Sequence, residues 1–245
     1  QGTAAIVAVG SGTVCDVAKH AGNKLGVPVI LYPTAASMNG YTSGITALKV
    51  RGLKRTLPCT PALAVFANPE HVATAPVRMT AAGVADFLSK CSSTTDWRAS
   101  NLLLDAPFDP KAREFFEGIQ ERLLDAAPRI GQGDPAAVAL ALEALLLSGF
   151  SMIIAGSSAP ASGGEHLISH FLDMKSALNA TPHDLHVAQV GVATVHCLRL
   201  WERILALEPE DVEIDALIAQ APDDAEVAGA ILDDWGTEVG AEVQA

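Results

Sequence analysis

Three histidines in the second half of the chain are spaced so that they could bind one ion or one substrate. His166 and His170 are four positions apart, so on a helix their rings project from one face, a single turn apart. His186 lies in a second segment that is too apolar to explain it as a solvated surface group. Two histidines lining the polar side of a packed helix would give the same i, i+4 spacing. The serine and glycines at 162–164 favour the first interpretation, because they let a ligand approach the backbone closely.

A carboxylate that could complete such a site lies in another apolar helical segment. Asp86 is the single carboxylate between 81 and 90, and burying it is costly unless it is paired or bound to a metal. Lys90 at i+4 offers the plainer alternative, an ion pair on the helix surface. Asp96 ends a polar run and is more easily explained as solvated. One carboxylate and two histidines form a ligand set suited to zinc or another first-row divalent ion.

The start of the chain predicts two strands that both end in small or hydroxyl residues. Residues 4–9 predict a strand that runs through a glycine turn at 10–13 into a helix over 14–25. Such a helix start can hold a phosphate, although two glycines alone are weak evidence for a dinucleotide. A second strand over 27–31 leads into the hydroxyl-rich loop 34–40. In a parallel sheet both turns lie at the ligand-binding edge, although ordinary turns could have the same composition.

The remaining chain predicts a hairpin with one more strand over 45–68 and then helices only. The helices are expected near 77–104, 110–128, 135–156, 163–179 and 183–207, with two weaker segments afterwards. We therefore predict an α/β part followed by an all-α part. The expected domains are 1–69 and 70–245, with a cleft between them.

The charge balance argues against a polyanionic partner. The chain has 28 acidic and 16 basic residues, and its net charge of −12 repels nucleic acid and anionic membranes. A small anionic substrate is still compatible, because backbone N–H groups and a metal can overcome the global field. The 49% of hydrophobic residues excludes a disordered chain, and 245 residues can bury a sizeable core.

The cysteines and the apolar segments indicate a reducing compartment and no membrane anchor. Cys15, Cys59, Cys91 and Cys197 are far apart and form no C-x2-C pair, so we expect buried thiols. No stretch has the length and freedom from charge of a membrane span, and the start lacks the basic region of a signal peptide. We expect a cytoplasmic protein.

Five separated blocks resemble the glycerol-1-phosphate dehydrogenase family, part of the iron-dependent alcohol dehydrogenase and dehydroquinate synthase-like superfamily. Residues 10–19 resemble its pyrophosphate turn and residues 33–40 its Pro-Thr-Ala-Ala-Ser loop. The segments around Asp86, His166 and His186 resemble its metal-ligand blocks. The resemblance implies a partial Rossmann-like dinucleotide domain before a helical one. The chain is short for the family, and we expect a fragment that lacks the N-terminal part.

The resemblance also assigns roles to individual residues. It implies that Asp86, His166 and His186 are the metal ligands, and that His170 touches the substrate, whereas spacing alone pairs His166 with His170. Position 39 is usually aspartate in the family, and Asn39 cannot accept a proton or carry charge, which affects substrate choice or proton handling. The implied dinucleotide contacts are Gly10, Ser11, Gly12, Thr13, Val14, Thr34, Ala35, Ala36, Ser37 and Ser43.

The implied reaction is hydride transfer between NAD(P)H and dihydroxyacetone phosphate to give sn-glycerol 1-phosphate. Its requirements would be NAD or NADP and one divalent ion, with zinc favoured over nickel or iron, and the protein could be a homodimer. The alternatives on the same scaffold are a glycerol or polyol dehydrogenase and a dehydroquinate synthase-type cyclase. A third alternative, from another class, is an inactive nucleotide- or metal-binding fragment.

Overall fold

The computed structural model describes residues 2, 4–50 and 53–244. A parallel sheet forms its first part. Strands β1 (Ile6–Gly10) and β2 (Val29–Pro33) are connected by helix α1 (Gly12–Leu25), and β2 also pairs with the short β5 (Ala64–Val65). Gly10 is the register partner of Pro33, so the glycine turn and the 34–40 loop leave the sheet at the same edge. This arrangement confirms the prediction that the two turns lie at the same edge of a parallel sheet.

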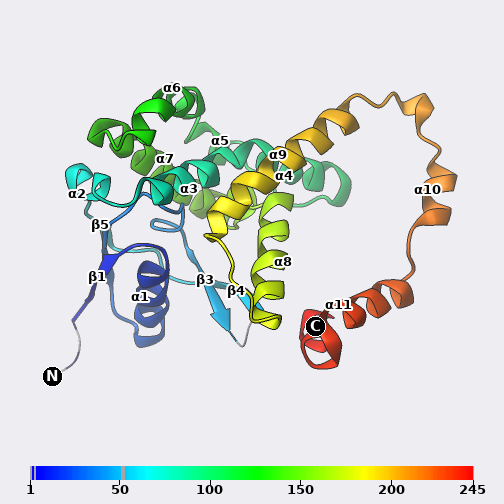
Figure 1. Cartoon of the computed structure of the whole chain (residues 1–245), viewed down its shortest axis with the longest axis horizontal. Helices are drawn as coiled ribbons and strands as arrows, with labels where there is room; N and C mark the ends of the chain where they lie inside the picture. Colours follow the sequence, from blue (N-terminus) through cyan, green and yellow to red (C-terminus); the bar gives the residue numbers. More distant parts are fainter. Residues whose placement is uncertain (1, 3, 51–52, 245) are drawn as a thin grey trace.

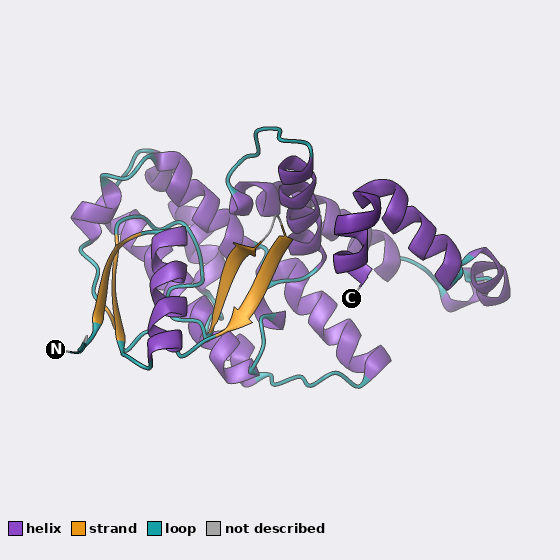
Figure 2. Ribbon diagram, turned by 90° about the horizontal axis from the view of Figure 1, so that it is seen from below, coloured by secondary structure: helices purple, strands orange, loops and turns teal. Residues whose placement is uncertain are grey.

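An antiparallel hairpin stands apart from the parallel sheet. Its strands β3 (Ile45–Val50) and β4 (Leu53–Pro58) pair only with each other among the described residues. Figure 2 shows the parallel strands at one end of the molecule and the hairpin nearer its middle. The hairpin packs against α1 on one side and, through β4, against a later helix, α8 (Gly164–Leu178). It therefore lies between the sheet and the helical part.

The rest of the described chain is helical, as predicted. In addition to α8, the helical elements are α2 (Pro69–Ala73), α3 (Val77–Leu88), α4 (Lys90–Leu104), α5 (Lys111–Glu114), α6 (Ile119–Gly131), α7 (Pro135–Ala155), η1 (Ala159–Ala161), α9 (His186–Leu205), η2 (Pro209–Asp211), α10 (Ile214–Gln220) and α11 (Asp224–Gln244). In Figure 1, α10 stands away from the body, and α11 returns to the end of α8. There Lys175 contacts Asp234, and Phe171 packs edge-on against Trp235.

Two helices that the sequence predicts as continuous are each interrupted. The predicted helix 77–104 is divided at Ser89, whose hydroxyl donates to the Asp86 carbonyl and so competes with the regular helical bonds. The predicted helix 110–128 is interrupted at Gly118, which has φ 72°, in the left-handed region. Glycine adopts that region at little cost, so the chain turns there.

Helix α7 corrects the expectation that no segment resembles a membrane span. Pro135–Ala155 is long and apolar enough by length and composition, with a mean hydropathy of 2.1. In the folded chain α7 packs against α2, α3, α5 and α6 instead, and it contributes Val138, Leu142 and Leu145 to the core. A core helix surrounded by other helices has no need of a polar face, and therefore carries few charges.

One apolar core joins the sheet to the helices. It contains Ala8 and Leu31 from the sheet together with Leu123, Val138 and Leu145 from the helical part. The helix α3 is held close to the 34–37 loop, because a methyl group on Gly83 would lie 2.1 Å from the Ala36 carbonyl oxygen. The α3 residue Asp86 is thereby brought against the strand ends. The division into domains 1–69 and 70–245 stays a prediction.

Candidate active site

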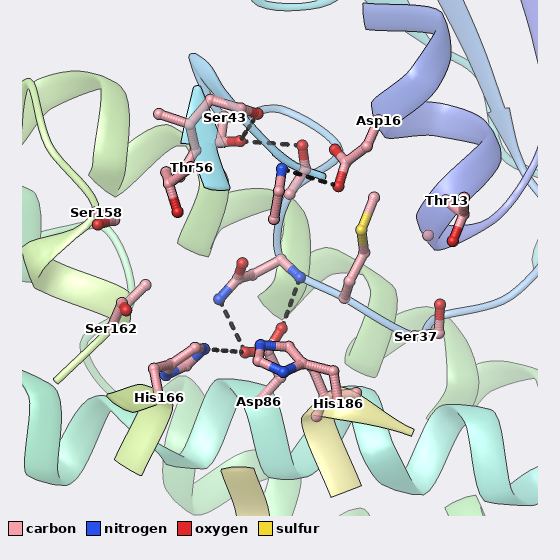
Figure 3. Close-up of a pocket in the computed structure, with 18 of the residues that line it drawn as sticks. Thr13, Asp16, Ser37, Ser43, Thr56, Asp86, Ser158, Ser162, His166 and His186 are labelled. Carbon is pink, nitrogen blue, oxygen red and sulfur yellow. Dashed lines mark hydrogen bonds and ion pairs between the residues drawn. The ribbon is translucent and has the colours of Figure 1, made fainter. Parts of the chain in front are cut away.

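A cavity of about 480 Å³ lies where the strand ends, the hairpin, and helices α3, α8 and α9 meet. Figure 3 shows side chains from all of these elements pointing into it, with Thr13, Asp16 and Ser37 on one side and His166 and His186 on another. The cavity brings together most of the residues predicted from sequence. These are Ser11, Gly12, Thr13, Val14, Ser37, Asn39, Ser43, Asp86, His166, His170 and His186. Gly10, Thr34, Ala35 and Ala36 lie outside its lining.

Asp86 is buried, at 1% exposure, and Asn39 and His166 contact its carboxylate. The backbone N–H of Asn39 donates to Oδ2 at 2.8 Å and its side-chain amide to Oδ1 at 3.1 Å. His166 Nε2 lies 3.5 Å from Oδ1. An aspartate at position 39 could not donate that side-chain hydrogen bond when ionised. The departure from the family pattern at Asn39 therefore gives Asp86 a second donor instead of a neighbouring negative charge.

The alternative partner for Asp86 does not reach it. Lys90 is buried and donates to the Pro160 carbonyl at 3.0 Å and to the Ser151 hydroxyl at 3.2 Å. Burial lowers its pKa to about 7, against the attraction of Asp86. The alternative of an ion pair on the helix surface is therefore wrong, because Lys90 is buried and its ammonium is bonded to residues of the helical core.

Asp96 also differs from the expected solvated carboxylate, because it accepts two hydrogen bonds from the protein. It accepts from Trp201 Nε1 at 2.6 Å and from the Gly164 N–H at 2.7 Å. The second bond satisfies a free amide at the start of α8 and places a negative charge beside the positive end of that helix. The expectation of a solvated side chain is therefore wrong. Asp96 fixes the N-terminus of the helix that carries His166 and His170.

The His166 ring is oriented by a carboxylate that the sequence analysis did not single out. Glu165 is fully buried, and its Oε1 lies 2.8 Å from His166 Nδ1 while its other oxygen accepts from Ser92. Burial lowers the pKa of His166, but the bonds to Asp86 and Glu165 outweigh it and raise the pKa to about 9. The protein therefore stabilises a positive charge between these two carboxylates. With Nδ1 bound to Glu165, the Nε2 atom faces Asp86.

His186 is oriented in the same way by Asp173, a second residue that the sequence analysis did not identify. Its Nδ1 lies 3.0 Å from Asp173 Oδ2 and 2.7 Å from the Ser169 hydroxyl. Burial raises the pKa of Asp173, but its bond to His186 and that ring's charge outweigh this effect and hold the pKa below its ordinary value. Asp173 and Ser169 follow His166 by seven and three residues on α8. That helical spacing was the available signal.

His170 lies beside both rings, and among the described residues no carboxylate is hydrogen-bonded to it. Its ring stacks on His186 at 5.1 Å between centroids and lies 6.3 Å from His166. Burial, followed by the neighbouring charges of His186 and His166, lowers its pKa to about 4. His170 is therefore neutral at physiological pH and can donate one hydrogen bond and accept another. This distinguishes it from His166 and His186, whose Nδ1 atoms both face carboxylates.

The donor set fits a divalent cation in its chemistry. Two histidines whose Nδ1 atoms are bound to carboxylates, together with the buried carboxylate of Asp86 that faces His166 Nε2, match the usual supports of a metal site. Within the described ranges, no group of three His, Cys, Asp or Glu side chains is already close enough to hold an ion. Binding would therefore require the predicted ligands Asp86, His166 and His186 to draw closer.

The glycine turn borders the same cavity from the opposite side. Ser11, before the first turn of α1, has its hydroxyl 2.9 Å from that of Tyr41 and is also bonded to Ser37. An added Cβ at Gly12 would meet no atom within 4 Å, so the space over this helix start is open. The first amides of a helix lack intrahelical partners and attract anions. This is the predicted place for a dinucleotide pyrophosphate.

Lys19 stabilises the loop after residue 37 by hydrogen bonds. Its position at the end of the 10–19 segment did not predict this role. Its ammonium is fully buried and donates to the carbonyls of Gly40 and Ile45, at 2.5 and 2.6 Å, and to that of Ser43 at 3.2 Å. Asp16, one turn before it, lies 3.7 Å away and lines the cavity. The loop that carries Asn39 is therefore fixed from α1.

A substitution at Gly12 tests the pyrophosphate prediction. Gly12→Val is expected to weaken NADH binding at least about tenfold, because its side chain would occupy the space that a phosphate needs over the helix start. Nothing else crowds this position, so thermal unfolding should change little. Fluorescence titration with NADH measures the effect. Gly131→Val, in equally open surroundings at the end of α6, is the control, and equal affinity of both variants would refute the assignment.

The fold is that of the iron-containing alcohol dehydrogenase type. The family model for iron-containing alcohol dehydrogenase matches residues 1–76. A solved structure of a probable glycerol dehydrogenase from Sinorhizobium meliloti superposes with a TM-score of 0.67 at 23% identity, over 96% of this chain and 62% of that one. A sulfoacetaldehyde reductase from Bifidobacterium kashiwanohense in complex with NAD+ superposes with a TM-score of 0.60 at 18% identity, over 95% of this chain and 62% of that one. These likenesses confirm the predicted fold class.

Curated relatives place the chain more narrowly. A glycerol-1-phosphate dehydrogenase of Bacillus licheniformis is 35% identical over 217 residues, which are 87% of this chain and 53% of that protein. One from Methanococcoides burtonii is 37% identical over 208 residues, 83% of this chain and 57% of that protein. Over four fifths of its length the chain is therefore similar to glycerol-1-phosphate dehydrogenases, and its first 76 residues match the iron-containing alcohol dehydrogenase family model. It spans about half the length of the curated relatives it matches.

Proposed function

We propose that this chain carries the metal- and substrate-binding part of an NAD(P)H-dependent glycerol-1-phosphate dehydrogenase, which reduces dihydroxyacetone phosphate to sn-glycerol 1-phosphate. The supporting observation is the single cavity that Asp86, His166, His170 and His186 share with the glycine turn. The similarity to relatives of that name supports the substrate. We further propose a cytoplasmic protein that uses zinc in preference to nickel or iron.

In the proposed reaction the metal, when bound, supplies a Lewis acid that polarises the C2 oxygen of the substrate. Glu165 and Asp173 hold the Nδ1 atoms of His166 and His186, and the Nε2 atom of His166 faces Asp86 at 3.5 Å. His170, neutral and next to His186, is suited to a hydrogen bond with a substrate hydroxyl. The dinucleotide would lie across the cavity, over Gly12 and Thr13.

Asn39 gives a reason to keep the polyol dehydrogenase alternative. Its amide is committed to Asp86, so it offers the substrate at most its amide oxygen, which cannot take a proton as the family's aspartate could. Proton transfer must then use another group or water. An unphosphorylated polyol is the competing substrate, because two of the solved structures with this fold are described as glycerol dehydrogenases.

Product analysis separates these functions. The metal-loaded protein is incubated with NADH and either dihydroxyacetone phosphate or dihydroxyacetone, and the product and its stereochemistry are determined. The proposal expects sn-glycerol 1-phosphate from the first substrate, at a kcat/KM at least about 100-fold above that for the second, the discrimination available to a site that pairs its polar groups with the substrate. A preference for dihydroxyacetone would identify a glycerol dehydrogenase instead.

A further inference from the structure

The cavity wall formed by the hairpin has one charged residue with no assigned role, Lys54. Its side chain is 15% exposed, and it is the one lysine or arginine among the described residues that line the cavity. Ile45, Ala47 and Thr56 line the cavity from the same hairpin. Ala47 is the cross-strand partner of Thr56, and side chains alternate along a strand, so these residues and Lys54 project from one face.

Lys54 adjoins the histidine cluster through Asp173. The Lys54 ammonium lies 3.8 Å from Asp173 Oδ2, the same oxygen that contacts His186 Nδ1 at 3.0 Å. At 3.8 Å the ammonium is within ion-pair distance but beyond hydrogen-bond length, and it has three N–H groups. Lys54 therefore lines the same cavity as the three histidines, on the wall that the hairpin forms.

The charges around Lys54 favour an anionic ligand. Lys49 is its direct cross-strand partner, and like charges in that relation repel. Burial lowers the pKa of Lys54, and the charge of Lys49 lowers it further, against the attraction of Asp173 and Asp16. Elsewhere the cavity presents the carboxylates of Asp16 and Asp86, in a chain of net charge −12. A phosphate group would find its electrostatic complement on the hairpin.

We propose that Lys54 binds the phosphate group of the substrate and so selects a phosphorylated three-carbon substrate over the free polyol. This inference rests on the proposed function. Thr56, two residues along the same strand, also lines the cavity and can donate its hydroxyl to the same group. The competing explanation is structural, namely that the pair with Asp173 ties the hairpin to α8. That role would affect phosphorylated and unphosphorylated ligands alike.

Calorimetric titration of the metal-replete protein with sn-glycerol 1-phosphate, glycerol and inorganic phosphate tests the inference. Lys54→Met and Lys54→Gln are expected to weaken glycerol 1-phosphate binding about 10- to 100-fold, the range of a lost charge-assisted hydrogen bond, and to leave glycerol binding unchanged. Lys54→Arg should restore most of the affinity. Lys24→Met, which removes an exposed charge outside the cavity lining, is the matched control and should bind as the parent does.

Each contrary outcome identifies what fails. If the parent protein does not prefer glycerol 1-phosphate over glycerol, the proposed function fails and the inference with it. If the parent has that preference and both neutral variants keep it, only the role of Lys54 is wrong. A parallel loss of glycerol and glycerol 1-phosphate binding, with a lower unfolding temperature, would assign Lys54 to the tie between hairpin and α8 and overturn the inference.

Discussion

Alanine in place of Asp86, His166 or His186 is expected to release the metal, whereas His170→Ala should retain it. The three predicted ligands form an N/N/O set, and the loss of any one removes both a bond and the geometry of the site. We expect each of these variants to lose more than about 100-fold in metal affinity, beyond the effect of removing an outer partner. Mass spectrometry of metal content after gel filtration measures the outcome.

The contrast with His170 makes this test specific. Its ring stacks on His186, but among the described residues no carboxylate is bonded to its Nδ1 in the way that Glu165 and Asp173 support the other two rings. His170→Ala should therefore weaken substrate binding and keep most of the metal. His183→Ala is a second control, because this half-exposed ring lies 3.7 Å from Asp173 and lines no part of the cavity. A metal-free His170 variant beside a metal-replete His186 variant would reverse the assignment.

The parallel strand ends and the helical histidines could be predicted because their signals are local. Gly10 to Thr13 follow an apolar run directly, and the i, i+4 spacing of His166 and His170 needs only helical geometry. Periodicity also predicts the α/β part before the all-α part. It does not show the break at Ser89, because a serine hydroxyl that bonds to the Asp86 carbonyl is one option among several for a serine in a helix.

Residues that act through long-range contacts could not be identified from sequence. Lys19 resembles a helix-surface lysine until the chain folds and the carbonyls of Gly40 and Ile45 close around its ammonium. Lys54 lies in a polar hairpin strand, and its contact partner Asp173 belongs to a helix that begins more than one hundred residues later. The sequence could not exclude Lys90 as a partner of Asp86 for the same reason. Lys90 has the right spacing, but the tertiary packing of α4 directs it to Pro160.

Asp173→Asn is expected to have the second large effect on metal affinity, because Asp173 is one of the two carboxylates that contact the histidine Nδ1 atoms. Asp173 is 3% exposed, and its Oδ2 is the anionic partner of His186 Nδ1. The asparagine keeps the size and one possible acceptor oxygen but removes the negative charge that orients the ring and raises its basicity. We expect metal affinity to fall about 10- to 100-fold, as for other outer-sphere carboxylates, without complete loss of the ion.

Glu165→Gln and Asp96→Asn complete this experiment. Glu165→Gln removes the negative charge next to His166 Nδ1 and should lower metal affinity by a similar factor. Asp96 is the control, because its carboxylate accepts hydrogen bonds from the Gly164 N–H and from Trp201 instead of from a histidine ring. Asp96→Asn should therefore lower stability by about 1–3 kcal/mol, because the amide nitrogen would face one of these two N–H donors, and should leave the metal dissociation constant unchanged. Metal titrations at fixed pH, with thermal unfolding of each metal-free variant, separate the two effects. If all three variants lose metal affinity in proportion to their loss of stability, the carboxylates support the fold of α8, and the orientation of the two rings does not depend on their charge.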